Sequence, residues 1–179
     1  FMSPCFQNPL KLGADIVMHS TTKYINGHSD VIGGAVITSD EAILTKLKFW
    51  ANNLGITGSP FDSYLTLRGL RTLGIRMEKH EKNAQAIVEI LSNNAKVKSV
   101  FYPGLAHHPS HEIAKKQQSG FGGMLSFELK EGLTGVKKFI EKIELLPFAG
   151  SLGGFESLIG HPYTLSLIHI SEPTRHSII

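Results

Sequence analysis

Short segments with the pattern of strands alternate with longer segments with the pattern of helices along most of this chain. Strands are expected where brief apolar runs are bounded by turn-forming residues, at residues 13–20, 33–38, 97–102, 123–129 and 145–149. Helices are expected where apolar residues recur with the helical period, at about residues 40–53, 60–77, 82–93 and 135–143. Such alternation is typical of an α/β fold. The spacing changes near Glu81, where we expect a domain boundary.

Local signals mark the ends of the first two helices. Ser39 is expected to cap the first helix, because acidic residues follow it in the first turn, and Gly55 is expected to end that helix. Ser59 and Pro60 are expected to begin the second helix, since proline is tolerated in a first turn. Between the first two strands, residues 21–30 are rich in Thr, Asn, Gly and Ser and are expected to form a polar loop.

Composition limits the class of protein. Apolar residues make up 41% of the chain and charged residues 18%, which is ordinary for a folded globular protein. The formal charge of +3 is small and the basic residues are dispersed, so a nucleic-acid partner is not expected. Apolar runs are too short for a membrane span, and residues 1–8 lack the pattern of a signal peptide. Cys5 is the only cysteine, which excludes an internal disulfide and favours a reducing, cytoplasmic compartment.

Lys23 stands just past the first expected strand, beside hydroxyl-bearing residues. A lysine amine in such a place can condense with the aldehyde of pyridoxal phosphate (PLP) to form a Schiff base. The hydroxyls of Ser20 and Thr22 can donate to the oxygens of the cofactor phosphate. On its own, this pattern is more often a surface lysine beside solvated hydroxyls, and His28 and Asp30 are more often loop-capping groups.

The wider segment, residues 20–31, resembles the lysine signature of the Cys/Met-metabolism (transsulfuration) family of PLP-dependent enzymes. Four further blocks resemble segments of the same family in the family order, at residues 1–10, 61–73, 120–127 and 151–158. The resemblance therefore spans about residues 1–162. Five ordered blocks are far more specific than any single block.

The resemblance implies an α/β fold of fold type I, similar to aspartate aminotransferase. Residues 1–81 would be the end of the large PLP-binding domain, and residues 82–164 would be part of the C-terminal domain. The family pattern stops after Thr164. Residues 165–179 resemble one reading frame of a transposon-derived sequencing adapter and are expected not to be native.

The resemblance also assigns roles to site residues, with PLP as the cofactor. Lys23 would form the Schiff base and, once released by substrate, would move protons between substrate carbons. Ser20 and Thr22 would hold the cofactor phosphate. Ser151 would lie near the substrate; the alternative for Ser151 is a turn serine before Gly153 and Gly154.

Residues 50–58 and 111–118 most resemble the cystathionine gamma-synthase group of the family, which implies gamma-replacement on an activated homoserine ester by cysteine, giving cystathionine. The alternatives are a cystathionine beta- or gamma-lyase, an O-acetylhomoserine sulfhydrylase, or a non-catalytic remnant that serves as an assembly partner. Gly150 departs from the family, because many members carry glutamate there, and substrate specificity is therefore open. The family implies a homotetramer built as a dimer of dimers.

Family members are longer than this chain, so both ends are expected to be cut. The aspartate that pairs with the pyridine nitrogen, the tyrosine that stacks on the ring and the arginine that binds the substrate carboxylate are implied by the family and would lie outside these residues. The chain alone is therefore expected to be inactive or nearly so.

Two other clusters in the sequence could suggest sites. His107, His108 and His111 could suggest a metal site, but cysteines and a second ligand cluster are lacking and Pro109 would interrupt a helix, so a solvated loop is expected. Residues 120–123 are glycine-rich but precede a strand rather than a helix, so we expect a turn and not a phosphate cradle.

Overall fold

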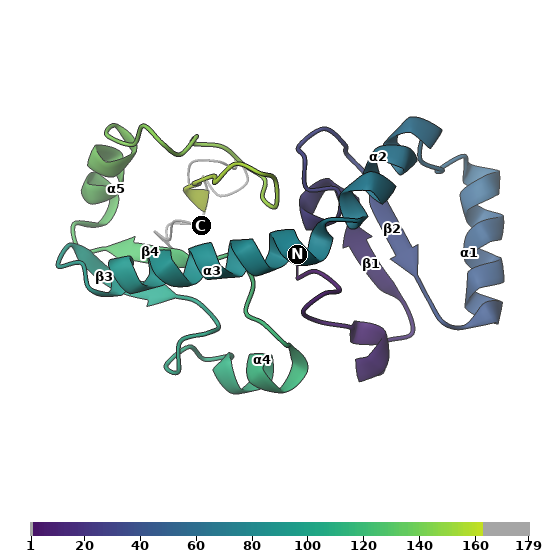
Figure 1. The fold of residues 1–179 in the computed structure, drawn as a ribbon, viewed down its shortest axis with the longest axis horizontal. Coiled ribbons are helices and arrows are strands. Elements are labelled where there is room, and N and C mark those ends of the chain that lie inside the picture. Colours follow the sequence, from purple (N-terminus) through teal and green to yellow (C-terminus); the bar gives the residue numbers. More distant parts are fainter. Residues whose placement is uncertain (1, 163–179) are drawn as a thin grey trace. The chain divides into compact units, whose positions relative to one another are not determined.

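The computed structural model describes residues 2–162 and contains two compact units. Within the described residues, the first unit runs to Met77 and also takes in Gln117–Ser119 and Gly153–Phe155, and the second unit comprises the remainder. Figure 1 shows the elements in chain order, from purple to yellow. The predicted assignment of residues 1–81 and 82–164 to two family domains stays a prediction, and the tail at residues 165–179 lies outside the described residues.

The first unit contains a two-stranded antiparallel sheet with helices around it (Figure 1). Strand β1 (Val17–Ser20) pairs with β2 (Gly34–Ile37), and Val17 lies opposite Ile37 while Ser20 lies opposite Gly34. The remaining elements of this unit are η1 (Pro9–Leu12), η2 (Thr21–Ile25), α1 (Glu41–Leu54), α2 (Pro60–Leu70) and the start of α3 (Leu73–Ser92). The segment that carries Lys23 follows directly after the end of β1.

The predicted polar loop at residues 21–30 is wrong for its first half, because Thr21–Ile25 form a single π-type turn. The buried side chains of Thr21, Tyr24 and Ile25 hold this turn against the unit. Polar composition predicts a polar loop, but the contacts that bury part of it come from residues distant in the sequence.

Both ends of α1 and the start of α2 have ordinary caps. Asp40, not the predicted Ser39, caps α1, because its carboxylate accepts a hydrogen bond of 2.8 Å from the backbone N–H of Ile43. Gly55 ends α1 with a φ of 66°, and Ser59 caps α2 by accepting from the N–H of Asp62. The predictions for Gly55 and Ser59 are confirmed.

The predicted break between helices is misplaced. The sequence predicted one helix across residues 60–77 and another across 82–93, whereas α2 ends at Leu70 and α3 runs without interruption from Leu73 to Ser92. Local periodicity does not reveal the break between α2 and α3. The break is stabilised by contacts with the turn at Thr21–Ile25, which is distant in the sequence.

The second unit has a core between β3 (Val97–Phe101), β4 (Ser126–Leu129), the C-terminal part of α3 and α5 (Gly132–Ile140). The strands are antiparallel, with a register shift between Val97 and Ser99. Buried members of the core are Ala84, Val88, Val100, Tyr102, Phe127, Val136 and Ile159. Full burial of a valine, isoleucine or phenylalanine side chain in this core contributes about 1.5–3 kcal/mol to stability.

Two sequence predictions in the second unit are wrong. Residues 145–149 were predicted as a strand, but the structure has only an isolated parallel bridge between Phe148 and Ile159, and Leu145 is 92% exposed. His111 was predicted in a solvated loop, but it begins helix α4 (His111–Gln117). Its ring stacks on Phe121 and its Nδ1 lies 2.8 Å from the carbonyl oxygen of Pro103.

Among residues 2–162, no helix is both long and apolar enough to cross a membrane. The same residues contain no cluster of His, Cys, Asp and Glu that could hold a metal ion.

Candidate functional site

Lys23 lies in the middle of η2, immediately after β1, with a half-buried side chain. Its backbone (φ −89°, ψ −133°) is non-helical inside an otherwise helical turn. Single π-type turns occur often at functional sites, because they redirect one side chain without ending the element. The turn is closed by hydrogen bonds from the N–H of Asn26 to the carbonyl of Thr21 (3.0 Å) and from the N–H of Gly27 to the carbonyl of Lys23 (2.9 Å).

The two predicted phosphate-binding hydroxyls lie on either side of the start of this turn. Ser20 is the last residue of β1, and its half-buried side chain makes no capping hydrogen bond with the turn in the described structure. Thr22 Oγ1 accepts from the N–H of Gly33 (3.0 Å) and lies 3.3 Å from the Gly33 carbonyl, to which it can donate. The hydroxyl of Ser20 is thus not used as a cap, whereas Thr22 is anchored to Gly33, just before β2.

Arg76, near the start of α3, contacts the turn just beyond Lys23. Its Nη1 donates to the carbonyl of Tyr24 (2.7 Å), and its Nη2 lies 3.4 Å from the carbonyl of Ile25. Nη2 also donates to the carbonyl of Gly69 (2.8 Å), and Nε donates to Thr72 Oγ1 (3.0 Å). One guanidinium therefore joins the lysine turn to the break between α2 and α3.

Glycines allow close packing around the same turn. A Cβ on Gly69 of α2 would overlap the backbone of Asn26, and a Cβ on Gly153 would lie 2.5 Å from the nitrogen of Tyr24. A Cβ on Gly27, whose φ is 72°, would fall on the guanidinium of Arg76. These positions need glycine because the neighbouring backbone or side chain occupies the space of a Cβ.

Sequence reasoning missed Arg76, Gly69 and Gly153 as parts of this site. Gly69 and Gly153 lie in blocks that resemble the family, but the position of their neighbours is not visible in the sequence. Arg76 carried no signal, since it reads as an ordinary polar residue of a helix.

His28 and Asp30 make local contacts, in agreement with a capping role. His28 Nδ1 lies 2.7 Å from the carbonyl oxygen of Asn26, and the Asn26 side-chain amide donates to Asp30 Oδ1 (2.6 Å). Both residues are exposed, whereas Asn26 is buried between them and the turn.

Burial changes the acid–base behaviour of two residues near Lys23. Burial raises the pKa of Tyr24 to about 12, because the phenolate would be poorly solvated. Burial lowers the pKa of His19 on β1, because the charged imidazolium would be poorly solvated. Both residues are therefore held in their neutral forms over a wider pH range than in water.

Ser151 belongs to the second unit, is exposed, and has a φ of 105°, which is rare for a residue with a side chain. Such backbone strain is found most often at functional sites and in tight turns. Both expectations for Ser151, a substrate-side residue or a turn serine, agree with this conformation. Its role stays a prediction.

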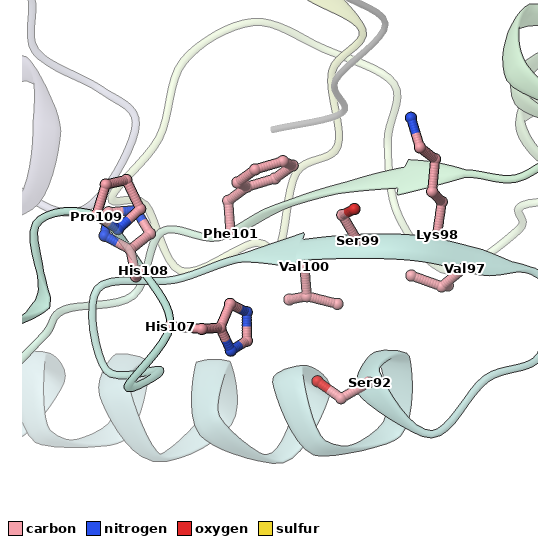
Figure 2. A pocket seen from close by; sticks show the side chains of 9 residues that line it. All are labelled: Ser92, Val97, Lys98, Ser99, Val100, Phe101, His107, His108 and Pro109. Carbon is pink, nitrogen blue, oxygen red and sulfur yellow. The ribbon is translucent and has the colours of Figure 1, made fainter.

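The second unit has a separate open pocket of about 330 Å³, shown in Figure 2. Val97 and Val100 of β3, Ser92 at the end of α3, and the loop with His107 and His108 line it. None of the predicted site residues lies in this pocket, so it gives no support to the lysine site.

The residues around Lys23 fit PLP by their chemistry. The half-buried lysine supplies an amine at the end of a strand, and Ser20 and Thr22 supply hydroxyl groups within three residues of it. An amine that can form a Schiff base and hydroxyls that can donate to phosphate are the groups this cofactor requires.

Solved structures share this fold over nearly the whole chain. A cystathionine gamma-synthase from Xanthomonas oryzae pv. oryzae, in complex with aminoacrylate and cysteine, matches with a TM-score of 0.94 and 50% identity. The match covers 99% of this chain and 48% of that chain, and the same enzyme in complex with cystathionine matches equally well. The fold is therefore part of a fold-type I PLP-dependent enzyme, as predicted.

The family model for Cys/Met metabolism PLP-dependent enzymes matches residues 1–178, and the chain belongs to this family. The predictions of the family and of its cofactor, PLP, are confirmed.

Curated relatives with different activities match this chain about equally well. Cystathionine gamma-synthase of Escherichia coli (strain K12) and cystathionine gamma-lyase of Dictyostelium discoideum are each 54% identical over 175 residues, 98% of this chain and 45% of the relative. Cystathionine beta-lyase of Coxiella burnetii is 50% identical over 99% of this chain and 46% of its own length. The chain thus spans about half the length of these relatives.

Proposed function

We propose that this chain carries the cofactor-binding lysine of an enzyme that joins an activated homoserine ester to cysteine, giving cystathionine by gamma-replacement. The observation that carries the proposal is the position of Lys23, in a hydrogen-bonded turn at the end of β1, three and one residues after the hydroxyl-bearing Ser20 and Thr22. The resemblance of residues 50–58 and 111–118 to cystathionine gamma-synthases supports this substrate pair.

In this proposal Lys23 is the catalytic residue. PLP, when bound, supplies an aldehyde for the lysine amine and a ring that withdraws electrons from carbons of the bound substrate. Lys23 Nζ holds the cofactor and, after substrate displaces it, takes and returns protons at the substrate carbons. The hydrogen-bonded turn keeps this amine within reach of the reacting atoms, which lowers the entropic part of the barrier.

Ser20 and Thr22 bind the cofactor phosphate in this proposal, and Ser151 lies on the substrate side. The Ser20 hydroxyl can donate without breaking a helix cap. Thr22 is oriented by Gly33, so its oxygen is held in place before the cofactor arrives. A hydroxyl bonded to a charged phosphate is worth about 1.5–3 kcal/mol.

Cystathionine cleavage is the second candidate, because gamma- and beta-lyases match this chain about as well as the gamma-synthases do. Gly150 bears on the choice between synthase and lyase, because many family members carry glutamate at this position. A Cβ at Gly150 would meet no described atom within 4 Å, so the backbone here would accept a glutamate. A homoserine sulfhydrylase, which would use sulfide in place of cysteine, is a further candidate.

The test uses the complete protein expressed from its native gene. Homoserine esters are supplied with cysteine or with sulfide, and cystathionine is supplied alone. Faster formation of cystathionine from ester and cysteine than either other reaction supports the proposal. Dominant cleavage of cystathionine, or dominant use of sulfide, replaces it with the corresponding alternative, and absence of both turnover and PLP binding supports a non-catalytic remnant. A homotetrameric assembly and a cytoplasmic location are parts of the same proposal.

A further inference from the structure

Arg76 makes hydrogen bonds to the carbonyls of the two residues that follow Lys23, Tyr24 and Ile25. The carbonyls of Tyr24 and Ile25 belong to residues whose exposed fractions are 5% and 7%. Carbonyls so deeply placed have little access to water, and a buried acceptor without a donor costs about 1–3 kcal/mol. The guanidinium therefore stabilises this particular conformation of the turn.

The planar shape of the guanidinium matters here. Nη1 and Nη2 reach the lysine turn, Nη2 also reaches Gly69 near the end of α2, and Nε reaches Thr72 just before α3. Arginine offers five donors in a fixed plane, whereas a lysine ammonium offers its donors from one point. Arginine can thus bind acceptors on separate segments at the same time.

The surrounding chain leaves room for this side chain. Gly27 follows the lysine turn, and a Cβ there would overlap the guanidinium. Gly69 packs on the backbone of Asn26, which brings the end of α2 close enough for Arg76 to bridge the two. The position of the Arg76 guanidinium is therefore set by the close packing of the backbone at Gly27 and Gly69.

The consequence falls on Lys23. Lys23 is the one residue of η2 with a non-helical backbone, and Arg76 holds the carbonyls of the next two residues, Tyr24 and Ile25. The peptide group between Lys23 and Tyr24 joins the Lys23 Cα to the part of the turn that Arg76 holds. A change in the backbone at Tyr24 and Ile25 would be passed through this peptide group and would redirect the lysine amine.

We propose that Arg76 is a positioning residue for Lys23: its guanidinium fixes the turn so that the lysine amine is directed at the bound cofactor. This inference rests on the proposed role of Lys23 as the PLP-binding lysine. The alternative is that Arg76 only joins α2 to α3, in which case its loss would lower stability without changing the lysine.

The test uses three variants of the complete protein. R76M removes all donors at similar volume, R76K keeps the charge but not the planar fork, and R71M removes an exposed arginine at the end of α2 as the matched control. Thermal unfolding reports stability. The dissociation constant for PLP and the pH midpoint of the visible band of lysine-bound PLP report the lysine itself.

We expect R76M to bind PLP about tenfold to a hundredfold more weakly than the wild type, in line with the effect of a misplaced reacting group, and to shift the pH midpoint of the band. R76K should recover part of the affinity and retain part of the shift. R71M should match the wild type in both readouts.

Equal affinity and an equal pH midpoint in R76M and R71M would overturn the inference, even if R76M unfolds at a lower temperature. If R76M does not fold, R76K decides: wild-type behaviour of R76K in both readouts would also overturn it. The proposed function fails separately, if borohydride traps no PLP on Lys23 in the wild-type protein.

Discussion

Gly153 packs directly against the backbone of Lys23: a Cβ at position 153 would lie 2.8 Å from the carbonyl carbon of Lys23. The φ of Gly153 is 80°, in the left-handed region that side chains disfavour. The two residues are far apart in the sequence but belong to the same compact unit. The lysine turn is thus enclosed by backbone from a distant segment.

Replacing Gly153 with alanine should destabilise the protein by at least about 2 kcal/mol, because it adds both backbone strain and overlap with backbone atoms. Gly150→Ala is the control, since a Cβ there meets open space, and its effect should lie within about 0.5 kcal/mol. Urea unfolding measures both. Equal stability of the two variants would show that the contact between Gly153 and Lys23 is absent.

Two glycines in helices should respond to alanine with opposite signs. Gly74→Ala in α3 should raise stability by about 0.5–1 kcal/mol, because its Cβ meets no described atom and alanine favours the helix. Gly69→Ala in α2 should lower stability by about 1–3 kcal/mol, because its Cβ would overlap the backbone of Asn26. Thermal or urea unfolding compares them, and a stabilising Gly69→Ala would refute this packing.

The two hydroxyls beside Lys23 should be separable by experiment. Ser20→Ala and Thr22→Val should each weaken PLP binding by about tenfold or more, because each loses a hydrogen bond to a charged phosphate. Thr22→Val should also lower stability by about 1 kcal/mol, since the N–H of Gly33 loses its acceptor.

Thr45→Val on α1 is the control for the two hydroxyl variants, because the Thr45 hydroxyl donates only to its own helix, at Glu41. Equilibrium titration with PLP and urea unfolding separate the two effects. If Ser20→Ala binds PLP as the wild type does, Ser20 is not a phosphate ligand.

Tyr24 should make stability depend on pH in the alkaline range. Its pKa is about 12 in the folded protein and about 10 when unfolded, so the unfolded state loses its proton first as pH rises. The stabilisation is complete below pH of about 10 and is lost as pH rises toward about 12, by about 2 kcal/mol.

The comparison with Tyr24→Phe isolates this effect, because every other titrating group is common to both proteins. The unfolding free energy of the wild type should fall relative to that of Tyr24→Phe between pH of about 9 and about 11.5. A difference between the two proteins that stays constant over this range would contradict the burial of the Tyr24 hydroxyl.

Sequence reasoning predicted the features of this chain that depend on neighbouring residues. The helix end at Gly55 and the cap at Ser59 follow from local chemistry, and Lys23 was expected just past a strand, where it lies. Periodicity indicated an α/β fold, whereas resemblance to a family supplied the particular fold type and the cofactor, which periodicity does not indicate.

The features that were missed depend on contacts across long stretches of chain. The break between α2 and α3 is bridged by Arg76, which also binds Tyr24, a residue 52 positions away. The π-type turn around Lys23 is packed against Gly69 and Gly153. Periodicity and capping rules describe neighbours in sequence, so they could not predict the contacts of Arg76, Gly69 and Gly153 with the turn around Lys23.

The chain alone should lack the activity of the complete protein. Several large apolar side chains of the first unit are exposed, including Met18, Trp50 and Phe61, which indicates surfaces that the complete protein covers. The measurement is the rate of turnover of homoserine ester with cysteine, for the chain alone and for the complete protein at equal concentration. Comparable rates would contradict it.

The attachment of PLP to Lys23 is the most direct test of the central claim. The complete protein is incubated with PLP, reduced with borohydride and digested, and the peptide that carries the cofactor is identified by mass spectrometry, with Lys23→Ala treated in parallel. We predict a visible band that borohydride removes, PLP trapped on the peptide containing Lys23, and neither signal in Lys23→Ala. Trapping on a different lysine, or a visible band that survives in Lys23→Ala, would contradict the assignment of this site.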